Sequence, residues 1–159
     1  MTTSGKKDDD SAELQGVAKF GDLIAADHAV LGDPNESSRR GDRVALVVQD
    51  TATWWIDCYP SAHKSTEEAM KALQNFAGAQ DVVKRLYSDN SGELDMAATK
   101  LMWRHDTATP KRPHTNGVAE SAVRKVLEGT RAVLLQSGLP HKWWAEAAKC
   151  FCCLRNTCD

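Results

Sequence analysis

The sequence lacks the long apolar run that a membrane-spanning segment needs. None of its hydrophobic stretches approaches the ~20 residues that cross a bilayer. Residues 1–16, MTTSGKKDDDSAELQG, also lack the apolar centre of a secretory signal peptide. We therefore expect no membrane partner, a cytosolic or nuclear setting, and a polar, disordered lead-in over residues 1–18. The 159 residues, 42% hydrophobic and 26% charged, are enough for one soluble domain with a real core.

Cysteines are few and unevenly placed. The chain has five, an odd number, and four of them fall in the last ten residues. This argues against the disulfide framework of a small secreted protein. Cys150 and Cys153 form a C-x-x-C, yet no second such pair lies nearby. We therefore predict small buried thiols on a helix face in preference to a zinc site.

A strong excess of charge of one sign is also missing, because the net charge is only −2. The charges are nevertheless unevenly distributed. Residues 1–99 carry ten Lys and Arg against 17 Asp and Glu, whereas residues 100–131 carry seven against three. A basic segment inside an acidic chain can form a phosphate-facing surface. An ordinary solvated face is the alternative.

The apolar periodicity indicates a mixed α/β domain that begins with antiparallel strands and continues with parallel ones. We predict strands in KFGDLIAADHAVL, ending near Asp27, in RVALVVQD, and in TATWWIDCYP, stopped by Pro60. A helix in KSTEEAMKALQNFAG, capped by Ser65 or Thr66, and a strand in DVVKRLYSD follow. The chain then reads as the helix GELDMAATKLMW, the extended HDTATP, the basic loop KRPHTNG, and the helices VAESAVRKVLEGTRAVLLQSG and LPHKWWAEAAKCFCCLRN.

Three acids stand where such a domain could bring them together. Asp27 ends the first predicted strand, Asp89 ends the fourth, and these strands can be neighbours in a mixed sheet. Glu120 follows Asn116, the predicted helix cap, by four residues, so the helix dipole would favour its ionised form. Converging carboxylates repel one another unless a hard cation such as Mg²⁺ lies between them. By spacing alone the set is weak, because a chain with 22 acids offers many triples.

The segments around these acids resemble the catalytic core of retroviral and retrotransposon integrases, closest to the copia-like elements. The resemblance rests on three motifs in the family's order, GDLIAADHAV, SDNSGEL and TPKRPHTNGVAESAVRKV, and spans about Phe20 to Asn156. It implies a ribonuclease-H-like α/β fold over residues 19–159, with a mixed five-stranded sheet flanked by helices. It also implies Mg²⁺ or Mn²⁺, as two ions, and DNA 3′-end processing followed by strand transfer.

Carried over residue by residue, the resemblance makes Asp27, Asp89 and Glu120 the catalytic, metal-binding acids. Asp22 competes for the first place, but it stands five residues earlier at the start of the strand, so Asp27 is preferred. Arg124 shares the helix face of Glu120, and a simple Glu–Arg helix pair explains it equally well. The residues that we expect to contact DNA are Lys111, Arg112, His114, Asn116, Arg124 and Lys125.

The resemblance also sets expectations for partners and context. We expect DNA, as element ends and as target, a homo-oligomer, and a nuclear location reached from the cytoplasm. The sequence has neither the zinc module nor the basic DNA-binding domain that flank such cores, so we expect a core cut from a longer polyprotein. Two alternatives stay open: an inactive remnant that only binds DNA or partners, and another enzyme of the same fold, a transposase or a ribonuclease H.

Two tryptophan pairs, Trp54–Trp55 and Trp143–Trp144, have two interpretations. Exposed tryptophans can serve as stacking platforms for bases. In a strand and a helix, however, one member of each pair is more often buried, and we predict packing for both pairs.

Overall fold

The β-branched and alternating apolar segments form the strands, and the segments of helical period cover them. The computed structural model describes residues 16–31, 36–79, 82–107 and 113–158, and of residues 113–116 it describes the backbone alone. Along these residues the elements are β1 (Ile24–Val30), β2 (Val44–Asp50), β3 (Ile56–Ser61), α2 (Thr66–Ala77), β4 (Arg85–Ser88), α3 (Gly92–Leu101), β5 (Arg104–Thr107), α4 (Pro113–Ser137), the short 3₁₀ helix η1 (His141–Trp143) and α5 (Trp144–Thr157).

The five strands make one mixed sheet in the order β3-β2-β1-β4-β5. β1 pairs antiparallel with β2, and β2 antiparallel with β3, as two successive hairpins. β4 and β5 then add in parallel on the other side of β1. The predicted antiparallel beginning and parallel continuation are therefore confirmed, and β1 is the central strand.

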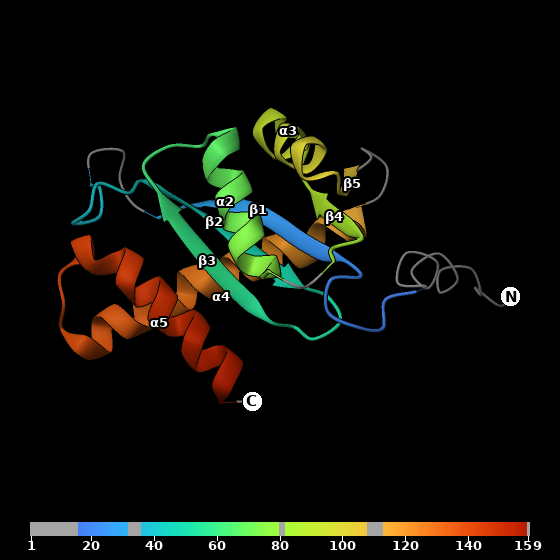
Figure 1. Cartoon of the computed structure of the whole chain (residues 1–159). Helices are drawn as coiled ribbons and strands as arrows, with labels where there is room; N and C mark the ends of the chain where they lie inside the picture. The colour runs from blue at the N-terminus through green and yellow to red at the C-terminus, as the bar shows by residue number, and fades with distance from the viewer. Residues whose placement is uncertain (1–15, 32–35, 80–81, 108–112, 159) are drawn as a thin grey trace, which may run out of the picture.

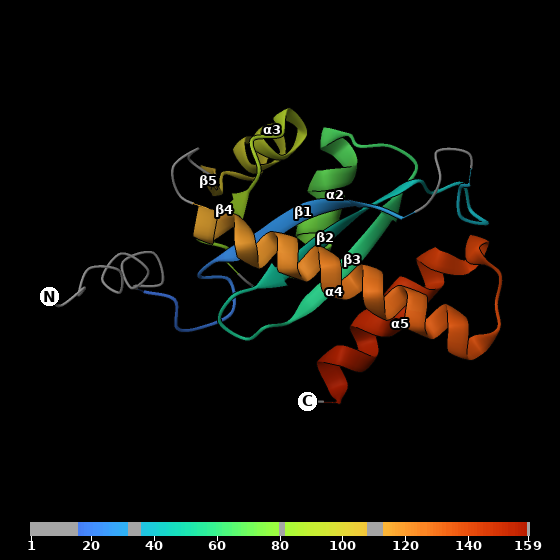
Figure 2. The ribbon, with the colours of Figure 1, turned by 180° about the vertical axis from the view of Figure 1, so that it is seen from behind.

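Helices cover both faces of this sheet, as Figures 1 and 2 show from opposite sides. One face buries Ile24 and Ala26 of β1 against α2 and α3, with Leu73 and Leu94 in the same apolar cluster. The other face buries alternate residues against α4 and α5, and there Trp144 is fully buried. The alternation along β1 therefore assigns each of its side chains to one helical layer.

Helix α2 begins as its sequence predicts. The Ser65 hydroxyl accepts a hydrogen bond from the Glu68 amide at 3.2 Å, which satisfies one of the free donors of the first turn. Glu67 and Glu68 lie in that turn, where the positive end of the helix dipole favours acids. The buried face includes Ala69, Leu73 and Phe76, the three residues that the periodicity selects.

The sheet edge at β3 is closed by a side chain of α5. Asn156 donates from Nδ2 to the Ile56 carbonyl at 2.8 Å and accepts the Ile56 amide on Oδ1 at 3.0 Å. This pairing imitates the bonds of a neighbouring strand and covers an edge that could otherwise pair with another chain. Pro60 lies inside β3 and does not stop it, contrary to the prediction, because an edge strand tolerates a residue without an amide hydrogen.

Two element boundaries differ from those predicted in the region of the acids. β1 continues through Asp27 to Val30, because its antiparallel pairing with β2 extends to Val30↔Val44. α4 begins at Pro113, so His114 and Asn116 lie within a helix and not in a loop. Proline is favoured at a first helical position, where no amide hydrogen is needed, and this outweighs the turn tendency of Asn116 and the glycine after it.

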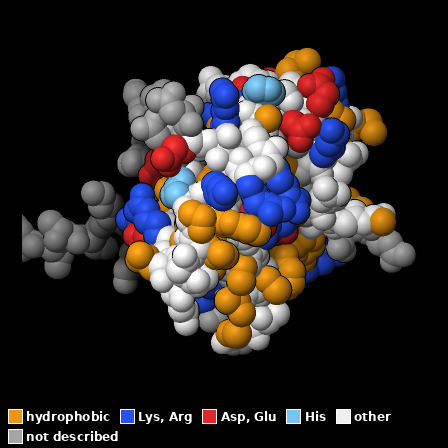
Figure 3. All heavy atoms as spheres, turned by 90° about the vertical axis from the view of Figure 1, so that its left-hand side faces the viewer, with side chains coloured by type: hydrophobic (Ala, Val, Ile, Leu, Met, Phe, Trp, Pro, Cys, Tyr) orange, Lys and Arg blue, Asp and Glu red, His pale blue; other side chains and the backbone are white. Residues whose placement is uncertain are grey.

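Apolar side chains are exposed at the end of the molecule where α4 meets α5. Leu135 is 84% exposed and Leu139 is 45% exposed. Figure 3 shows hydrophobic side chains gathered on this face beside a group of basic ones. Within the described ranges, no helix is both long and apolar enough to cross a membrane.

Two glycines of α4 should respond oppositely to alanine, because only one of them faces another helix. A Cβ on Gly129 would lie 2.1 Å from the Phe151 ring of α5, whereas a Cβ on Gly117 would meet no heavy atom of the described part of the chain within 4 Å. We expect Gly129→Ala to lower the free energy of unfolding by about 1–3 kcal/mol through overpacking. Gly117→Ala should raise it by about 0.5–1 kcal/mol through helix propensity. Urea unfolding of both variants measures the contrast, and equal effects would contradict this helix packing.

Candidate active site

The parallel pairing of β1 with β4 brings two of the predicted acids together. Ala26 is the register partner of Ser88, so Asp27 and Asp89 occupy the next pair of positions along the same ladder. Asp27 lies on the sheet face that carries Ala29, which is buried against α4 and α5. Asp89 follows β4 directly and is exposed, while Asp27 is half-buried. The two carboxylates therefore stand side by side at the end of β4.

Glu120 comes to the same place from helix α4. This helix crosses the face of the sheet that is turned toward the viewer in Figure 2, and its N-terminal part lies beside β4. Because α4 begins at Pro113, Glu120 is the eighth helical residue and lies beyond the first turn. The dipole argument for its ionisation is therefore wrong, since the dipole acts within the first turn.

The pKa of Asp27 is affected by burial and by both of the other acids. Its pKa is raised, first because burial removes water from the carboxylate, and further by the negative charges of Asp89 and Glu120. The His28 amide donates to Asp27 Oδ1 at 2.7 Å and opposes the rise, as does the positive charge of Lys64. Like charges at one site disfavour ionisation, so a cation bound between the carboxylates would be strongly stabilised.

On the opposite side of β1, His28 has two charged neighbours that the sequence did not single out, Glu93 and Lys64. His28 Nδ1 lies 3.9 Å from Glu93 Oε1, and the His28 side chain is only 6% exposed. Burial lowers the pKa of His28, and the charge of Lys64 lowers it further, while Glu93 and Asp89 act in the opposite sense. The available signal for Glu93 was its place four residues after Asp89. Lys64 carried no such signal, because only the fold brings it to β1.

A hydrogen-bonded chain holds the end of β4 just before Asp89. The Ser88 hydroxyl donates to the Asp89 carbonyl at 2.8 Å and lies 2.7 Å from His105 Nε2 of β5. His105 Nδ1 in turn lies 3.0 Å from Asp95 Oδ1 of α3. The Asp95 carboxylate can only accept a hydrogen bond, and the Ser88 hydroxyl already donates its proton to the Asp89 carbonyl. All three hydrogen bonds therefore form together when each ring nitrogen of His105 donates a proton. This chain fixes the backbone that carries Asp89.

Asp22, the competitor for the first acid, has a structural role. Its carboxylate contacts Lys84 Nζ at 2.7 Å and accepts the amides of Ala18 and Lys19 at 2.9 and 3.0 Å. The Lys84 contact and these amides hold the pKa of Asp22 well below its usual value. It therefore ties the segment before β1 to the start of β4, at the opposite end of the strand from Asp89.

The residues predicted to contact DNA are only partly described. Arg124 is exposed on α4, and Lys125, which is half-buried, lies 5.6 Å above the Trp54 ring. His114 and Asn116 belong to the first turns of α4 by backbone, and Lys111 and Arg112 lie outside the described residues.

Comparison with known proteins gives one sequence relative and a clear structural likeness. No known family model matches the sequence. The retrovirus-related Pol polyprotein from transposon TNT 1-94 of Nicotiana tabacum is 29% identical over 145 residues, which cover 85% of this chain and 11% of the polyprotein. A chain of the simian T-cell lymphotropic virus intasome, solved with PP2A regulatory subunit B56 gamma, aligns with a TM-score of 0.71 at 18% identity, covering 91% of this chain and 51% of that one.

A second structure narrows the likeness to one domain. The catalytic core domain of HTLV-2 integrase, solved in complex with magnesium in a trimeric form, aligns with a TM-score of 0.61 at 14% identity, covering 85% of this chain and 84% of that one. This chain has the fold of an integrase catalytic core. The ribonuclease-H-like fold and the five-stranded mixed sheet are thereby confirmed, and so is the resemblance to retroviral and retrotransposon integrases.

The cysteines of the integrase-like core only partly follow their prediction. Cys152 is buried on α5, but Cys150 and Cys153 are exposed, so the C-x-x-C is not a buried pair. Among the described residues, one group of three has donor atoms that all lie within 4.8 Å of one another, namely Asp57, Cys58 and Cys152, whereas the donor atoms of Asp27, Asp89 and Glu120 are spaced more widely. Lys149 already binds Asp57 there at 2.8 and 2.9 Å, and contact with Cys152 and burial raise the pKa of the Cys58 thiol. This group is therefore packing of α5 on β3.

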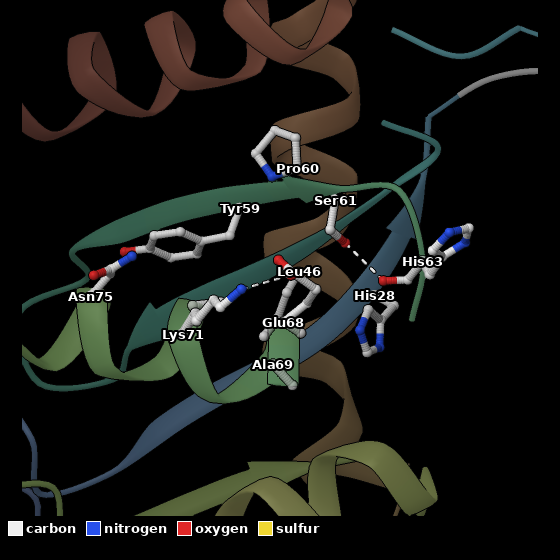
Figure 4. A pocket seen from close by; sticks show the side chains of 11 residues that line it. His28, Leu46, Tyr59, Pro60, Ser61, His63, Glu68, Ala69, Lys71 and Asn75 are labelled. Carbon is white, nitrogen blue, oxygen red and sulfur yellow. Dashed lines mark hydrogen bonds and ion pairs between the residues drawn. The ribbon is translucent and has the colours of Figure 1, made fainter. Parts of the chain in front are cut away.

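A small pocket between β3 and α2 is unsuited to a large ligand. His28, Tyr59, Ser61 and Lys71 are among the residues that surround it (Figure 4). Its volume is about 190 Å³, below the roughly 300–1,000 Å³ of typical ligand pockets. The chemistry is therefore better sought at the exposed carboxylates on the other face of β1.

Replacing Asp27 should stabilise the metal-free core. We expect Asp27→Asn to raise the free energy of unfolding at pH 8 by about 0.5–2 kcal/mol, because it removes a half-buried charge that its neighbours repel. A raised pKa means that the parent loses stability as pH rises, so the gain should vanish as pH falls through that pKa. Asp22→Asn is the control of opposite sign, since that carboxylate has a lowered pKa and stabilises the fold above pH ~4. Urea unfolding between pH 3 and 8 without divalent ions makes the comparison, and a destabilised Asp27→Asn would contradict the clustering.

Removing the His105 ring should loosen the support of Asp89. We expect His105→Ala to lower the free energy of unfolding by about 1–3 kcal/mol, because the buried Ser88 oxygen loses its hydrogen bond to the ring and keeps only its bond to the Asp89 carbonyl. His141→Ala is the matched control: His141 also faces a carboxylate, Glu36 at 3.4 Å, but its side chain is 48% exposed. That exposed contact should change stability by less than about 0.5 kcal/mol. Equal losses in the two variants would count against the buried chain.

Proposed function

We propose that this integrase-like core is the catalytic part of a DNA-integrating enzyme. It would trim the 3′ ends of element DNA and join them to a target. The observation that carries the proposal is geometric: the parallel register of β1 with β4 brings Asp27 beside Asp89 on the sheet face that α4, the helix of Glu120, covers. The polyprotein and intasome relatives support the assignment, although the chain spans only 11% of that polyprotein.

The donors present fit Mg²⁺ or Mn²⁺. Carboxylate oxygens are the ligands that these hard cations prefer, and two exposed carboxylates beside a half-buried one leave room for water and substrate oxygens. The HTLV-2 core was solved with magnesium, which supports the same choice here. Asp27, Asp89 and Glu120 would hold the ions, which we propose are two. Bound there, they would supply charge stabilisation to the attacking and leaving oxygens of phosphodiester displacement.

The reaction proceeds as two displacements at phosphorus. In the first, the oxygen of a water forms a bond to a phosphorus near the element end, and the bond to the 3′ oxygen breaks. This leaves a 3′-hydroxyl on the element and a 5′-phosphate on the released nucleotides. In the second, that 3′-hydroxyl attacks a target phosphodiester, and a target 3′-hydroxyl leaves.

The residues of the chain position the DNA for these steps. With the ions bound, the carboxylates would position the reacting phosphate, and the Ser88–His105 contact keeps the Asp89 backbone in place. Arg124, exposed one turn after Glu120, faces the same side of α4 and can contact the phosphate backbone. Lys111, Arg112, His114, Asn116 and Lys125 complete the proposed DNA contacts. Work on chromosomal DNA implies a nuclear location, and synapsis of two element ends implies a homo-oligomer.

Metal-dependent cleavage tests the proposal directly. Labelled oligonucleotides that carry the element's terminal sequences, incubated with the core in Mg²⁺ or Mn²⁺, should be shortened at the 3′ end and joined to target DNA. Asp27→Asn, Asp89→Asn and Glu120→Gln should each reduce both products to the level seen without metal. The folded state of each variant is checked by its urea unfolding curve.

The matched control removes an acid from the same helix at a distance from the site. Glu128→Gln lies two turns after Glu120, is also exposed, and should retain the parent rate within about twofold. Mg²⁺ should also raise the unfolding free energy of the parent, by ~2.7 kcal/mol at 100 times the dissociation constant, and not that of Asp89→Asn. Cleavage by Asp89→Asn at the parent rate, or an equal loss in Glu128→Gln, would contradict the assignment. A parent that binds DNA without cleaving it would support the inactive remnant.

A further inference from the structure

The hairpin between β2 and β3 exposes two tryptophans against expectation. Trp54 is 56% exposed and Trp55 is 47% exposed, so the prediction that one of this pair is buried is wrong. The other pair behaves as predicted, because Trp144 is fully buried. Large aromatic side chains are usually buried or at interfaces, so an exposed pair at a hairpin tip needs an explanation.

Trp54 is also held in an unfavourable backbone conformation. Its φ is +63°, in the left-handed region, where a residue with a Cβ is disfavoured by roughly 1–2 kcal/mol. Among the described residues other than glycine, only Met102 shares this property, and Met102 ends helix α3, where the left-handed conformation is ordinary. A glycine at position 54 would relieve the strain. Strain retained at an exposed position is a reason to look for function.

The rest of the turn fixes Trp54 in place. The Asp50 carboxylate, fully buried, accepts the amides of Gly21, Ala52 and Thr53 at 3.0, 3.1 and 2.7 Å and the Thr53 hydroxyl at 2.8 Å. The Trp54 amide donates to the Asp50 carbonyl at 3.0 Å, and Gln49 Nε2 donates to the Trp54 carbonyl at 3.3 Å. The indole is thus presented to solvent on a rigid support, which lowers the entropy cost of binding a flat ligand.

A positive charge lies next to this indole, on the helix that carries Glu120. Lys125 Nζ lies 5.6 Å from the centre of the Trp54 ring, within the range of a cation–π contact. Lys125 follows Glu120 by five residues, about 7.5 Å along the helix axis. Asp50, at the base of the turn, pairs with Ile24, three residues before Asp27 and so about 10 Å away along β1. The base of the turn is therefore about three nucleotide spacings from Asp27 along the strand direction.

We propose that Trp54 is a stacking platform for an unpaired base of the DNA strand that leads to the carboxylates, with Lys125 binding the phosphate beside that base. The inference rests on the proposed function and extends it by naming where the frayed strand is held. An exposed indole with an adjacent ammonium matches a nucleotide, which has a flat apolar face and a negative charge on one unit. Stacking is tolerant of base identity, so this contact would hold the strand without selecting its sequence.

Binding to unpaired and abasic overhangs tests this inference. The whole chain is titrated, in EDTA to prevent cleavage, into three fluorescent DNAs: a duplex with a three-nucleotide overhang, the same duplex with abasic overhang sugars, and a blunt duplex. Fluorescence anisotropy measures each dissociation constant. Stacking of one base corresponds to a roughly 5- to 150-fold preference for the normal overhang over the abasic one. Trp54→Gly should abolish this preference while binding the blunt duplex as the parent does.

Trp54→Gly is expected to fold, because it relieves the left-handed strain, and its urea midpoint should equal or exceed that of the parent. Met102→Gly is the matched control, since it makes the same change at an exposed left-handed residue and should keep the base preference. Lys125→Gln should weaken binding to both overhangs alike. Equal affinity of the parent for normal and abasic overhangs, or a preference that survives in Trp54→Gly, would overturn the inference. With metal-dependent cleavage intact, such a result leaves the proposed function standing; with no DNA binding and no cleavage, both fail.

Discussion

The repulsion between carboxylates at the end of β4 is the constraint on which the rest of the structure depends. The parallel pairing of β1 with β4 places Asp27 and Asp89 at adjacent register positions, and the packing of α4 adds Glu120. Without a bound cation, such a cluster of like charges does not stabilise the folded chain. The two apolar layers provide the stability that holds the like charges together.

The two sides of the sheet hold the carboxylate site in place through different contacts. On the β4 side, Ser88 and His105 fix the backbone before Asp89 through buried hydrogen bonds. On the β3 side, Asn156 closes the strand edge and docks α5, which in turn packs against α4. The β2–β3 hairpin lies at the β3 edge of the sheet and presents Trp54 to solvent. Rigid elements carry the acids, and an exposed turn carries the inferred nucleotide contact.

Local patterns in the sequence were enough for the order of elements and much of the core. Leu73 and Phe76 repeat at helical spacing, and both are buried. The apolar run of β2 fits a strand covered on both faces. The exact ends were not predictable in the same way, because they depend on pairing partners. β1 outlasts Asp27 only because β2 continues beside it, and Pro60 fits within β3 only because that strand lies at an edge.

The three acids could be predicted from the motifs around them, but the sequence does not specify how they are arranged in space. Asp27 and Asp89 come together because strands distant in sequence are adjacent in the sheet, which spacing alone does not specify. Lys64 was missed because it approaches β1 only in the fold. The exposure of Trp54 was missed for a related reason: burial of a tryptophan depends on whether another element covers it. Composition carries no information about that.

The most direct test of the central claim is the pKa of Asp27, measured by carbon NMR on the metal-free core and on its Asp89→Asn and Glu120→Gln variants. If the three acids share one site, the pKa of Asp27 is raised in the parent and falls in both variants, and Mg²⁺ lowers it in the parent. A pKa of Asp27 that is the same in all three proteins and unchanged by Mg²⁺ would contradict the account.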